Sequence, residues 1–160
     1  MSDKKVIKIG KEKTIKKDGN NEINNQDYIV QLDWIRKIYM NEEFNEKENI
    51  LQVLNKKISG YRYQDIIKKR DIDNIININD CVEKILSQKL LCYYCKKKLL
   101  IFYPYKRQDN QWTLDRIDNM IPHSNENTCV SCLKCNLQKR RRDHDKFKYT
   151  KQLVLIKDDN

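Results

Sequence analysis

The chain has no long apolar segment and few histidines. Among its 160 residues there is no run of about 18 apolar residues, so a transmembrane helix is not expected. The first residues are basic and lack the apolar stretch of a secretory signal. Disulfides are rare in chains that are not exported, so the six cysteines favour metal ligands or free thiols. These absences predict an intracellular protein with no membrane partner.

Acidic residues are outnumbered by basic ones. The chain has 33 Lys and Arg against 23 Asp and Glu, which gives a net charge of +10. One interpretation is a soluble, lysine-rich surface, and the other is a polyanionic partner, most often nucleic acid. Lysine is abundant together with asparagine and isoleucine, as is usual for an AT-rich genome, which weakens the second interpretation. With 39% hydrophobic and 35% charged residues the core must be modest, and a metal ion would help a small module to fold.

Four segments of different composition follow one another along the chain. Residues 1–26 are lysine-rich with few large apolar side chains, and they are predicted to be a disordered basic tail. Residues 27–90 carry apolar side chains at helical spacing and are predicted to be a helical region. Residues 91–148 contain two paired cysteine motifs and form a predicted zinc module. Residues 149–160 are predicted to be a C-terminal tail.

The helical region is expected to contain a helix that begins near residue 28 and a second over residues 46–58, stopped by Ser59 and Gly60. A short helix over residues 63–69 follows. A further helix is expected to be capped by Asn79 or Asp80 and to turn its apolar side chains inward. Cys81 lies in the first turn of that helix, and because it is unpaired we expect it to be buried and not to bind metal.

Two Cys-x-x-Cys pairs are the strongest motif. Each pair presents two sulfurs from a tight turn, and four thiolates satisfy the tetrahedral coordination of a structural zinc ion. The pairs are Cys92 with Cys95, and Cys132 with Cys135. Cys129 adds a third cysteine at the same spacing, so one of Cys129, Cys132 and Cys135 is surplus to a four-ligand site. The sequence therefore predicts a zinc ion that fastens the intervening segment as a loop.

The segment between the pairs carries residues suited to phosphate chemistry. Short strands are expected over residues 99–102, over residues 112–114 up to Asp115, and over residues 127–131, and Asn136 is expected to open a helix. A hard divalent cation prefers oxygen ligands and uses only one or two protein carboxylates or amides. Asp115 and Asn136 would supply two such oxygens. A cation held there would neutralise charge on a phosphate and stabilise a leaving oxygen.

The runs CYYC, WTLDRIDN and PHSNENTCVSCLKCNLQKRR occur in that order. They resemble the HNH, or ββα-metal, endonuclease family, nearest the zinc-clipped branch that includes phage endonuclease VII, over about residues 91–142. The resemblance implies an α+β chain with a helical N-terminal region and a zinc-bound ββα-metal (HNH) module. It also implies cleavage of DNA, with branched or structured DNA as one substrate class. A homodimer is an open alternative.

The resemblance assigns roles to individual residues. Asp115 and Asn136 would hold a catalytic Mg²⁺ or Mn²⁺, and the zinc would be structural. Cys129 is left out of the zinc site, because the pair that ligates zinc in the family directly precedes the asparagine. Asn127 would tie the loop together through side-chain to backbone hydrogen bonds. The variant Asp-Arg-Ile-Asp-Asn looks like that of phage and large-DNA-virus members, which suggests the nucleus or cytoplasm of a host cell, or a virion.

Arg116 is the main departure from the family. That position is usually a histidine that acts as general base, and an arginine with a pKa of about 12.5 or more cannot replace it. His123 could take over as the base, or it could be a loop histidine bonded to a backbone carbonyl. A metal-bound hydroxide could suffice, with Arg116 clamping the phosphate, or cleavage could be lost. His144, the only other histidine, is expected to contact phosphate or solvent.

A basic run follows the last motif. Lys139, Arg140, Arg141 and Arg142 are expected to form an exposed helix face that contacts phosphates without reading sequence, although a solvated face is the plainer interpretation. The alternative function is a non-catalytic, zinc-stabilised protein that binds or packages nucleic acid. A third possibility is a structural protein in which zinc only fastens a small domain.

Overall fold

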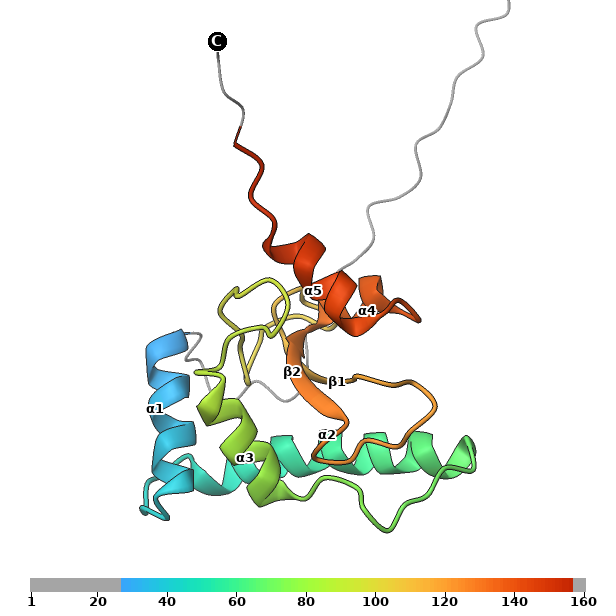
Figure 1. Cartoon of the computed structure of the whole chain (residues 1–160). Helices are drawn as coiled ribbons and strands as arrows, with labels where there is room; N and C mark the ends of the chain where they lie inside the picture. Colours follow the sequence, from blue (N-terminus) through green and yellow to red (C-terminus); the bar gives the residue numbers. More distant parts are fainter. Residues whose placement is uncertain (1–26, 157–160) are drawn as a thin grey trace, which may run out of the picture.

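The computed structural model describes residues 27–156, so the predicted basic tail over residues 1–26 and the last four residues lie outside the described part. Within it the chain is mixed α+β, as predicted, with five helices and one two-stranded sheet (Figure 1). In order along the chain these are α1 (Tyr28–Tyr39), α2 (Lys47–Ile67), α3 (Ile78–Ser87), β1 (Trp112–Arg116), β2 (Thr128–Cys132), α4 (Leu133–Lys139) and α5 (His144–Gln152). No helix within residues 27–156 is both long and apolar enough to cross a membrane.

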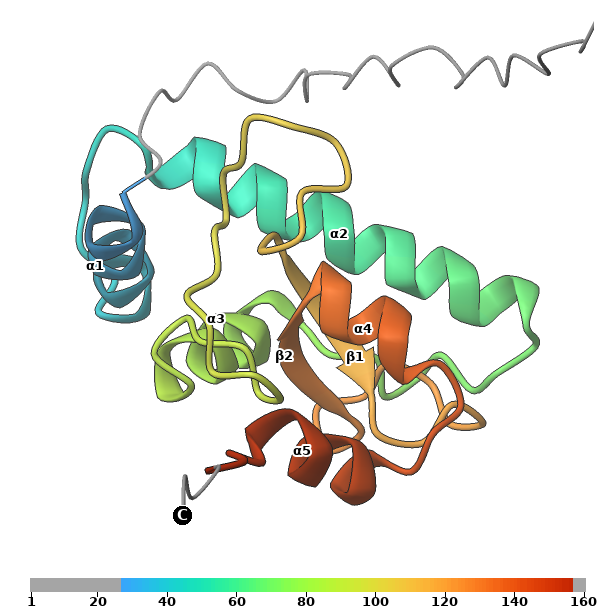
Figure 2. The same cartoon turned by 90° about the horizontal axis from the view of Figure 1, so that it is seen from above.

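Helix α2 runs without a break through the predicted stop at Gly60. No atom comes within 4 Å of a Cβ built at Gly60, so this position faces open space and its packing neither requires nor forbids glycine. A glycine inside a helix costs only about 1 kcal/mol relative to alanine. That cost is small beside the packing of a 21-residue helix that lies along the sheet (Figure 2). The predicted stop was therefore wrong, and the predicted short helix over residues 63–69 is the last part of α2.

Helix α3 is capped differently from the prediction. The side chain of Asn77, and not that of Asn79 or Asp80, accepts the hydrogen bond from the backbone N–H of Asp80. The helix turns Cys81, Val82 and Ile85 into the core, where it packs against α1. Cys81 is completely buried, as expected.

The predicted strand over residues 99–102 is not a strand. Leu99 and Leu100 bond to backbone groups of Leu90, Asn110 and Trp112, whereas residues 101–102 are paired with the side chain of Gln31, which is buried in α1. The Oε1 atom of Gln31 accepts hydrogen bonds from the backbone N–H of Ile101 at 2.7 Å and of Phe102 at 3.0 Å, and its Nε2 donates to Phe102. One isolated bridge links Leu100 to Gln111. A glutamine side chain therefore takes the place of a neighbouring strand for residues 101–102, and this contact also fixes α1 to the cysteine-rich half.

The two observed strands form an antiparallel hairpin followed directly by α4. Trp112 pairs with Cys132 at one end and Arg116 with Thr128 at the other. Cys132 is both the last residue of β2 and the N-cap of α4, so Asn136 lies inside the helix and does not open it. Helix α5 extends to Gln152, past the predicted boundary at residue 148. In Figure 1 the sheet lies between α4 and α2, and α4 contacts both strands.

Candidate functional site

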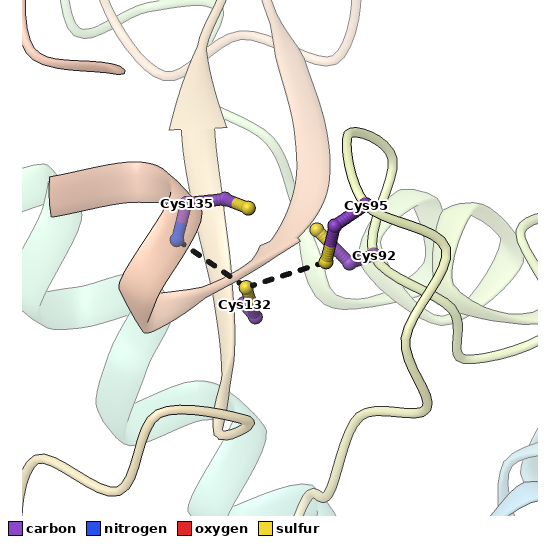
Figure 3. Close-up of side chains that lie close together, drawn as sticks. All are labelled: Cys92, Cys95, Cys132 and Cys135. Atoms are coloured by element: carbon purple, nitrogen blue, oxygen red, sulfur yellow. Dashed lines mark hydrogen bonds between the residues drawn. The ribbon is translucent and has the colours of Figure 1, made fainter. Parts of the chain in front are cut away.

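The two cysteine pairs converge on one point. The Sγ atoms of Cys92, Cys95, Cys132 and Cys135 all lie within 4.8 Å of one another, and those of Cys95 and Cys132 are 3.9 Å apart (Figure 3). Tetrahedral zinc with Zn–S bonds of about 2.3 Å requires sulfurs separated by roughly 3.8 Å. The structure thus brings together the four sulfurs that the sequence indicated, and the donor set fits a zinc ion.

Each pair sits in a turn that local hydrogen bonds define. In the first, Cys92 receives a hydrogen bond from Lys96 and donates one to Lys97, and Lys96 adopts a positive φ of 59°. The N–H of Tyr93 donates to the carbonyl of Val130 and so fastens this turn to β2. The second turn joins β2 to α4, where Cys135 donates its backbone N–H to the Sγ of Cys132. These hydrogen bonds place two segments that are distant in sequence against each other.

The electrostatics of the cluster favour a cation. In its absence the neighbouring sulfurs of Cys132 and Cys92 raise the pKa of Cys135, because several thiolates cannot coexist so close together. A bound divalent ion removes that repulsion and holds the ligands deprotonated. Cys129 lies outside the cluster: its thiol is 3.6 Å from the hydroxyl of Tyr94, and burial raises its pKa to about 12.

Asp115 lies next to the cluster, on β1, and only 6% of its surface is exposed. Its Oδ2 accepts a hydrogen bond from the hydroxyl of Tyr94 at 2.5 Å and lies 3.3 Å from the Nζ of Lys139. Burial raises the pKa of Asp115, and these two partners oppose that shift. A nearly buried carboxylate is thus held by one hydroxyl and one ammonium group, both on the same oxygen.

Asn136 lies over the same face of β1. Its Nδ2 donates to the Oγ1 of Thr113 at 3.1 Å, and Thr113 and Asp115 share a face because side chains alternate along a strand. Among residues 27–156 no hydrogen bond reaches Oδ1 of Asp115 or Oδ1 of Asn136. Both oxygens lack a hydrogen-bond partner but are not fully enclosed, so both are open to solvent. Two oxygens suited to a divalent cation therefore remain available.

His123 and Arg116 meet on a different carboxylate, that of Asp65 in α2. His123 is 3% exposed, its Nδ1 lies 2.8 Å from the Oδ2 of Asp65, and its ring stacks on Tyr61 with centroids 4.6 Å apart. The Nη1 of Arg116 is 3.8 Å from the Oδ1 of Asp65 and donates to the carbonyl of Asn119. Of the two alternatives for His123, the loop histidine bonded to a backbone carbonyl is wrong, since the partner of its Nδ1 is an aspartate.

Sequence reasoning missed Asp65, although a signal was present. Ile50, Leu54, Tyr61 and Asp65 follow one another at helical spacing, so a carboxylate occupies a position on the apolar stripe of α2. A charged residue on such a stripe is rarely buried without a charged partner.

Asn127 ties the loop between the strands together, as predicted. Its Nδ2 donates to the carbonyls of Asp118, Ile121 and Pro122, and its Oδ1 accepts from the N–H of Asp118. Asp118 itself accepts from the N–H of Met120, which is the contact of a turn residue. The loop that carries His123 is therefore held from inside by one amide side chain.

Lys139 is not part of an exposed basic face. Its side chain is fully buried, and Nζ donates to the carbonyl of Arg116 at 2.6 Å in addition to its contact with Asp115. Arg140, Arg141 and Arg142, by contrast, are exposed. The prediction of an exposed helix face was therefore wrong: Lys139 is on the helix but buried, and Arg140, Arg141 and Arg142 are exposed but follow the end of the helix.

His144 is also placed differently from the prediction. It is the first residue of α5, is 9% exposed, and its Nδ1 lies 2.9 Å from the hydroxyl of Tyr94. Its ring stacks on Tyr93 with centroids 4.9 Å apart. The expected contact with solvent was wrong for most of the ring. Tyr94 therefore connects His144 to Asp115, a link between segments about fifty residues apart that no local pattern indicates.

These groups line one large groove of about 1840 Å³, here called the hairpin groove, whose lining holds seven basic and six acidic side chains. Asp115, Asn136 and His144 belong to its lining, together with His123 and Arg116. Basic side chains reach it from the C-terminal end of α2 and from the connection between α4 and α5, which lie on the same side of the molecule in Figures 1 and 2. They are Lys68, Lys69 and Arg70 from the first and Arg140, Arg141 and Arg142 from the second.

No family model, no curated protein and no solved structure matches the chain.

Proposed function

We propose that the protein is a metal-dependent DNA endonuclease of the HNH type. The proposal rests on the thiolate cluster and the two open oxygens, which occur on the same hairpin and helix. A thiolate cluster fastens a turn against a hairpin and helix, and next to it the open oxygens of Asp115 and Asn136 line a groove bordered by basic side chains.

Two clusters of basic side chains in the groove support a polyanionic substrate, although the lining also carries six carboxylates, those of Asp71, Asp115, Asp118, Glu126, Asp143 and Asp145. Six basic side chains reach the groove from two separate elements, and three of them come from the helical region, which the sequence motif does not cover. Contacts from Lys and Arg to phosphates give affinity that falls steeply with salt and depends little on base sequence. The end of α2 would then contribute to DNA binding together with the Arg140 segment.

The chemistry supports phosphodiester hydrolysis. Asp115 and Asn136 would hold Mg²⁺ or Mn²⁺, which when bound supplies positive charge to the phosphate and to the leaving oxygen. Lys139 occupies only Oδ2 of Asp115, which leaves Oδ1 for that purpose. Arg116 adds positive charge beside the groove, but its hydrogen bond to Asn119 assigns it first to holding the loop.

Cleavage of supercoiled plasmid tests the proposal. The purified chain with Mg²⁺ or Mn²⁺ is expected to nick or linearise the plasmid, and Asp115→Asn is expected to abolish this while leaving zinc content unchanged. Asp109→Asn is the matched control, because Asp109 is an exposed acid in the same module that pairs only with the exposed Lys134. A wild-type chain that leaves the plasmid intact at every metal concentration contradicts the proposal.

A second candidate is a zinc-stabilised protein that binds DNA without cutting it. It is favoured by the ammonium group of Lys139 beside Asp115, which already neutralises the carboxylate, and by Arg116 at the usual position of the base. Gel shift of an uncut plasmid, lost at high salt, would select this candidate. Absence of both cleavage and gel shift at low salt would leave zinc with a purely structural role.

A further inference from the structure

Hydrolysis in the hairpin groove needs a group that accepts a proton from water. Arg116 does not meet this need, and His123 lies on the other face of the hairpin from Asp115 and Asn136. Arg116 stays protonated near neutral pH. The Nδ1 of His123 faces Asp65 and one side of its ring is covered by Tyr61, on the face of the hairpin that meets α2. Asp115 and Thr113 contact residues on the side of α4 and α5. They point away from the face that meets α2, because side chains alternate along β1.

The hydrogen bonds of Tyr94 determine how His144 is protonated. Tyr94 has one hydroxyl proton, and the adjacent Asp115 carboxylate can only accept, so this proton goes to Oδ2 of Asp115. A tyrosine hydroxyl with its ordinary pKa of about 10 is protonated near neutral pH. The Nδ1 of His144, 2.9 Å from the same oxygen, must then be the donor in that contact. A neutral imidazole with its proton on Nδ1 carries its lone pair on Nε2.

The position of Nε2 suits a proton acceptor. Within residues 27–156 it makes no hydrogen bond, it is not among the enclosed unpartnered atoms, and His144 lines the groove with Asp115 and Asn136. The ring is fixed by stacking on Tyr93 and by edge contact with Tyr94. Burial lowers the pKa of His144, so the ring is neutral near pH 7 and able to take up a proton.

We propose that Nε2 of His144 is the general base of this groove, with Tyr94 as the positioning residue that sets its tautomer. This inference rests on the proposed nuclease function. In the step, an O–H bond of water breaks and its proton goes to Nε2, while the water oxygen forms a bond to phosphorus. The bond from phosphorus to the 3′-oxygen breaks, and that oxygen leaves with the electron pair and is protonated by solvent.

The experiment compares full-length variants in plasmid cleavage, with zinc content and DNA gel shift as checks of folding. His144→Ala is expected to lower the cleavage rate by about 100-fold or more, with partial rescue by added imidazole. Tyr149→Ala, an exposed residue of the same helix, is the matched control and should cleave like the wild type. Tyr94→Phe should lower the rate less and should shift the acidic limb of the pH–rate profile, which a purely structural role would not do.

Nitrogen NMR of the imidazole gives a second readout that does not depend on cleavage. The wild type should show His144 protonated at Nδ1, and Tyr94→Phe should mix the two tautomers. Charged groups near the ring that must be held constant in the comparison are Asp115, Lys139, Asp145 and Lys148.

Each outcome bears on one of the two proposals. An active wild type with an unimpaired His144→Ala variant overturns the role of His144 but leaves the nuclease intact. Loss of cleavage in His123→Gln, with His144→Ala active, would transfer the role to His123. A wild type that never cleaves overturns the nuclease and with it the base. A proton found on Nε2 in the wild type also overturns the assignment.

Discussion

The carboxylate of Asp65 receives two hydrogen bonds from one residue: both the backbone N–H and the Nδ1 of His123 contact its Oδ2 at 2.8 Å, across 58 positions of sequence. Arg70 donates to the other oxygen at 3.0 Å. Burial alone would raise the pKa of Asp65, but the hydrogen bonds from His123 and Arg70 bring it below its ordinary value. The helical region is thus joined to the loop of the hairpin through one buried charge.

Removing that charge should destabilise the whole chain. Asp65→Ala leaves Arg70, His123 and Arg116 without their common partner, and breaking a buried ionic contact of this kind typically costs about 3–5 kcal/mol. The free energy of unfolding in urea measures the effect. Asp73→Ala, an exposed aspartate in the connection between α2 and α3, should change it by no more than about 0.5 kcal/mol. Equal losses in both variants would show that Asp65 does not connect the two halves.

The same contact predicts how stability depends on pH. Burial lowers the pKa of His123 below its ordinary 6.5, although Asp65 opposes this, so the unfolded chain takes up the proton at a higher pH than the folded chain. Stability is therefore fully present above about pH 6.5 and falls below it, by at most about 1.4 kcal/mol per pH unit for one proton. His144, whose pKa is also lowered by burial, adds a contribution of the same sign.

Comparison of wild type with His123→Gln isolates the first of these contributions. Urea unfolding at pH 7.5 and pH 5.5 should show a smaller loss of stability in the variant than in the wild type. Identical losses in the two proteins would mean that His123 titrates alike in the folded and unfolded chains.

Loss of zinc should destabilise the hairpin and α4 more than loss of a single hydrogen bond would. Cys135→Ser is expected to lose bound zinc and to lower the melting temperature, because the turn at Cys92 and the turn at Cys132 would then be joined by hydrogen bonds without the metal. Cys129→Ser is the matched control, since Cys129 is a neighbouring buried cysteine outside the cluster. Elemental analysis should find one zinc per chain in the control and none in Cys135→Ser. Equal zinc content would exclude Cys135 as a ligand.

The features that the sequence predicted well are those whose geometry is local. Spacing by two residues places both sulfurs of a pair on one turn, and Asn127 bonds to backbone groups within nine residues of itself. The features that it missed depend on contacts between distant segments. Gln31 takes the place of a strand for residues 101–102, and Tyr94 connects Asp115 to His144. Neither contact leaves a periodic pattern in the sequence. The proposed DNA-binding role of α2 falls in the same class, because only folding brings its basic end to the groove.

Two methionine substitutions in the basic run over residues 139–142 should have different effects, one on DNA binding and one on stability. Arg141 is exposed at the groove, so Arg141→Met should weaken DNA binding and lower the slope of log affinity against log salt by about 1, with little change in stability. Lys139 is buried against Asp115 and the carbonyl of Arg116, so Lys139→Met should leave that carboxylate without its counter-charge and lower stability by about 3 kcal/mol.

Fluorescence anisotropy with labelled duplex DNA between 50 and 200 mM salt, together with urea unfolding, separates the two effects, because each variant should change one measurement and leave the other nearly unaffected. The salt slope of Lys139→Met, measured at a temperature where the variant is folded, should equal that of the wild type. If Lys139→Met lowered the slope as Arg141→Met does, Lys139 would contact DNA, and its ammonium group would have to leave Asp115 when DNA binds. That result would also free Oδ2 of Asp115 for the cation, and it would make DNA binding a condition for assembling the metal site.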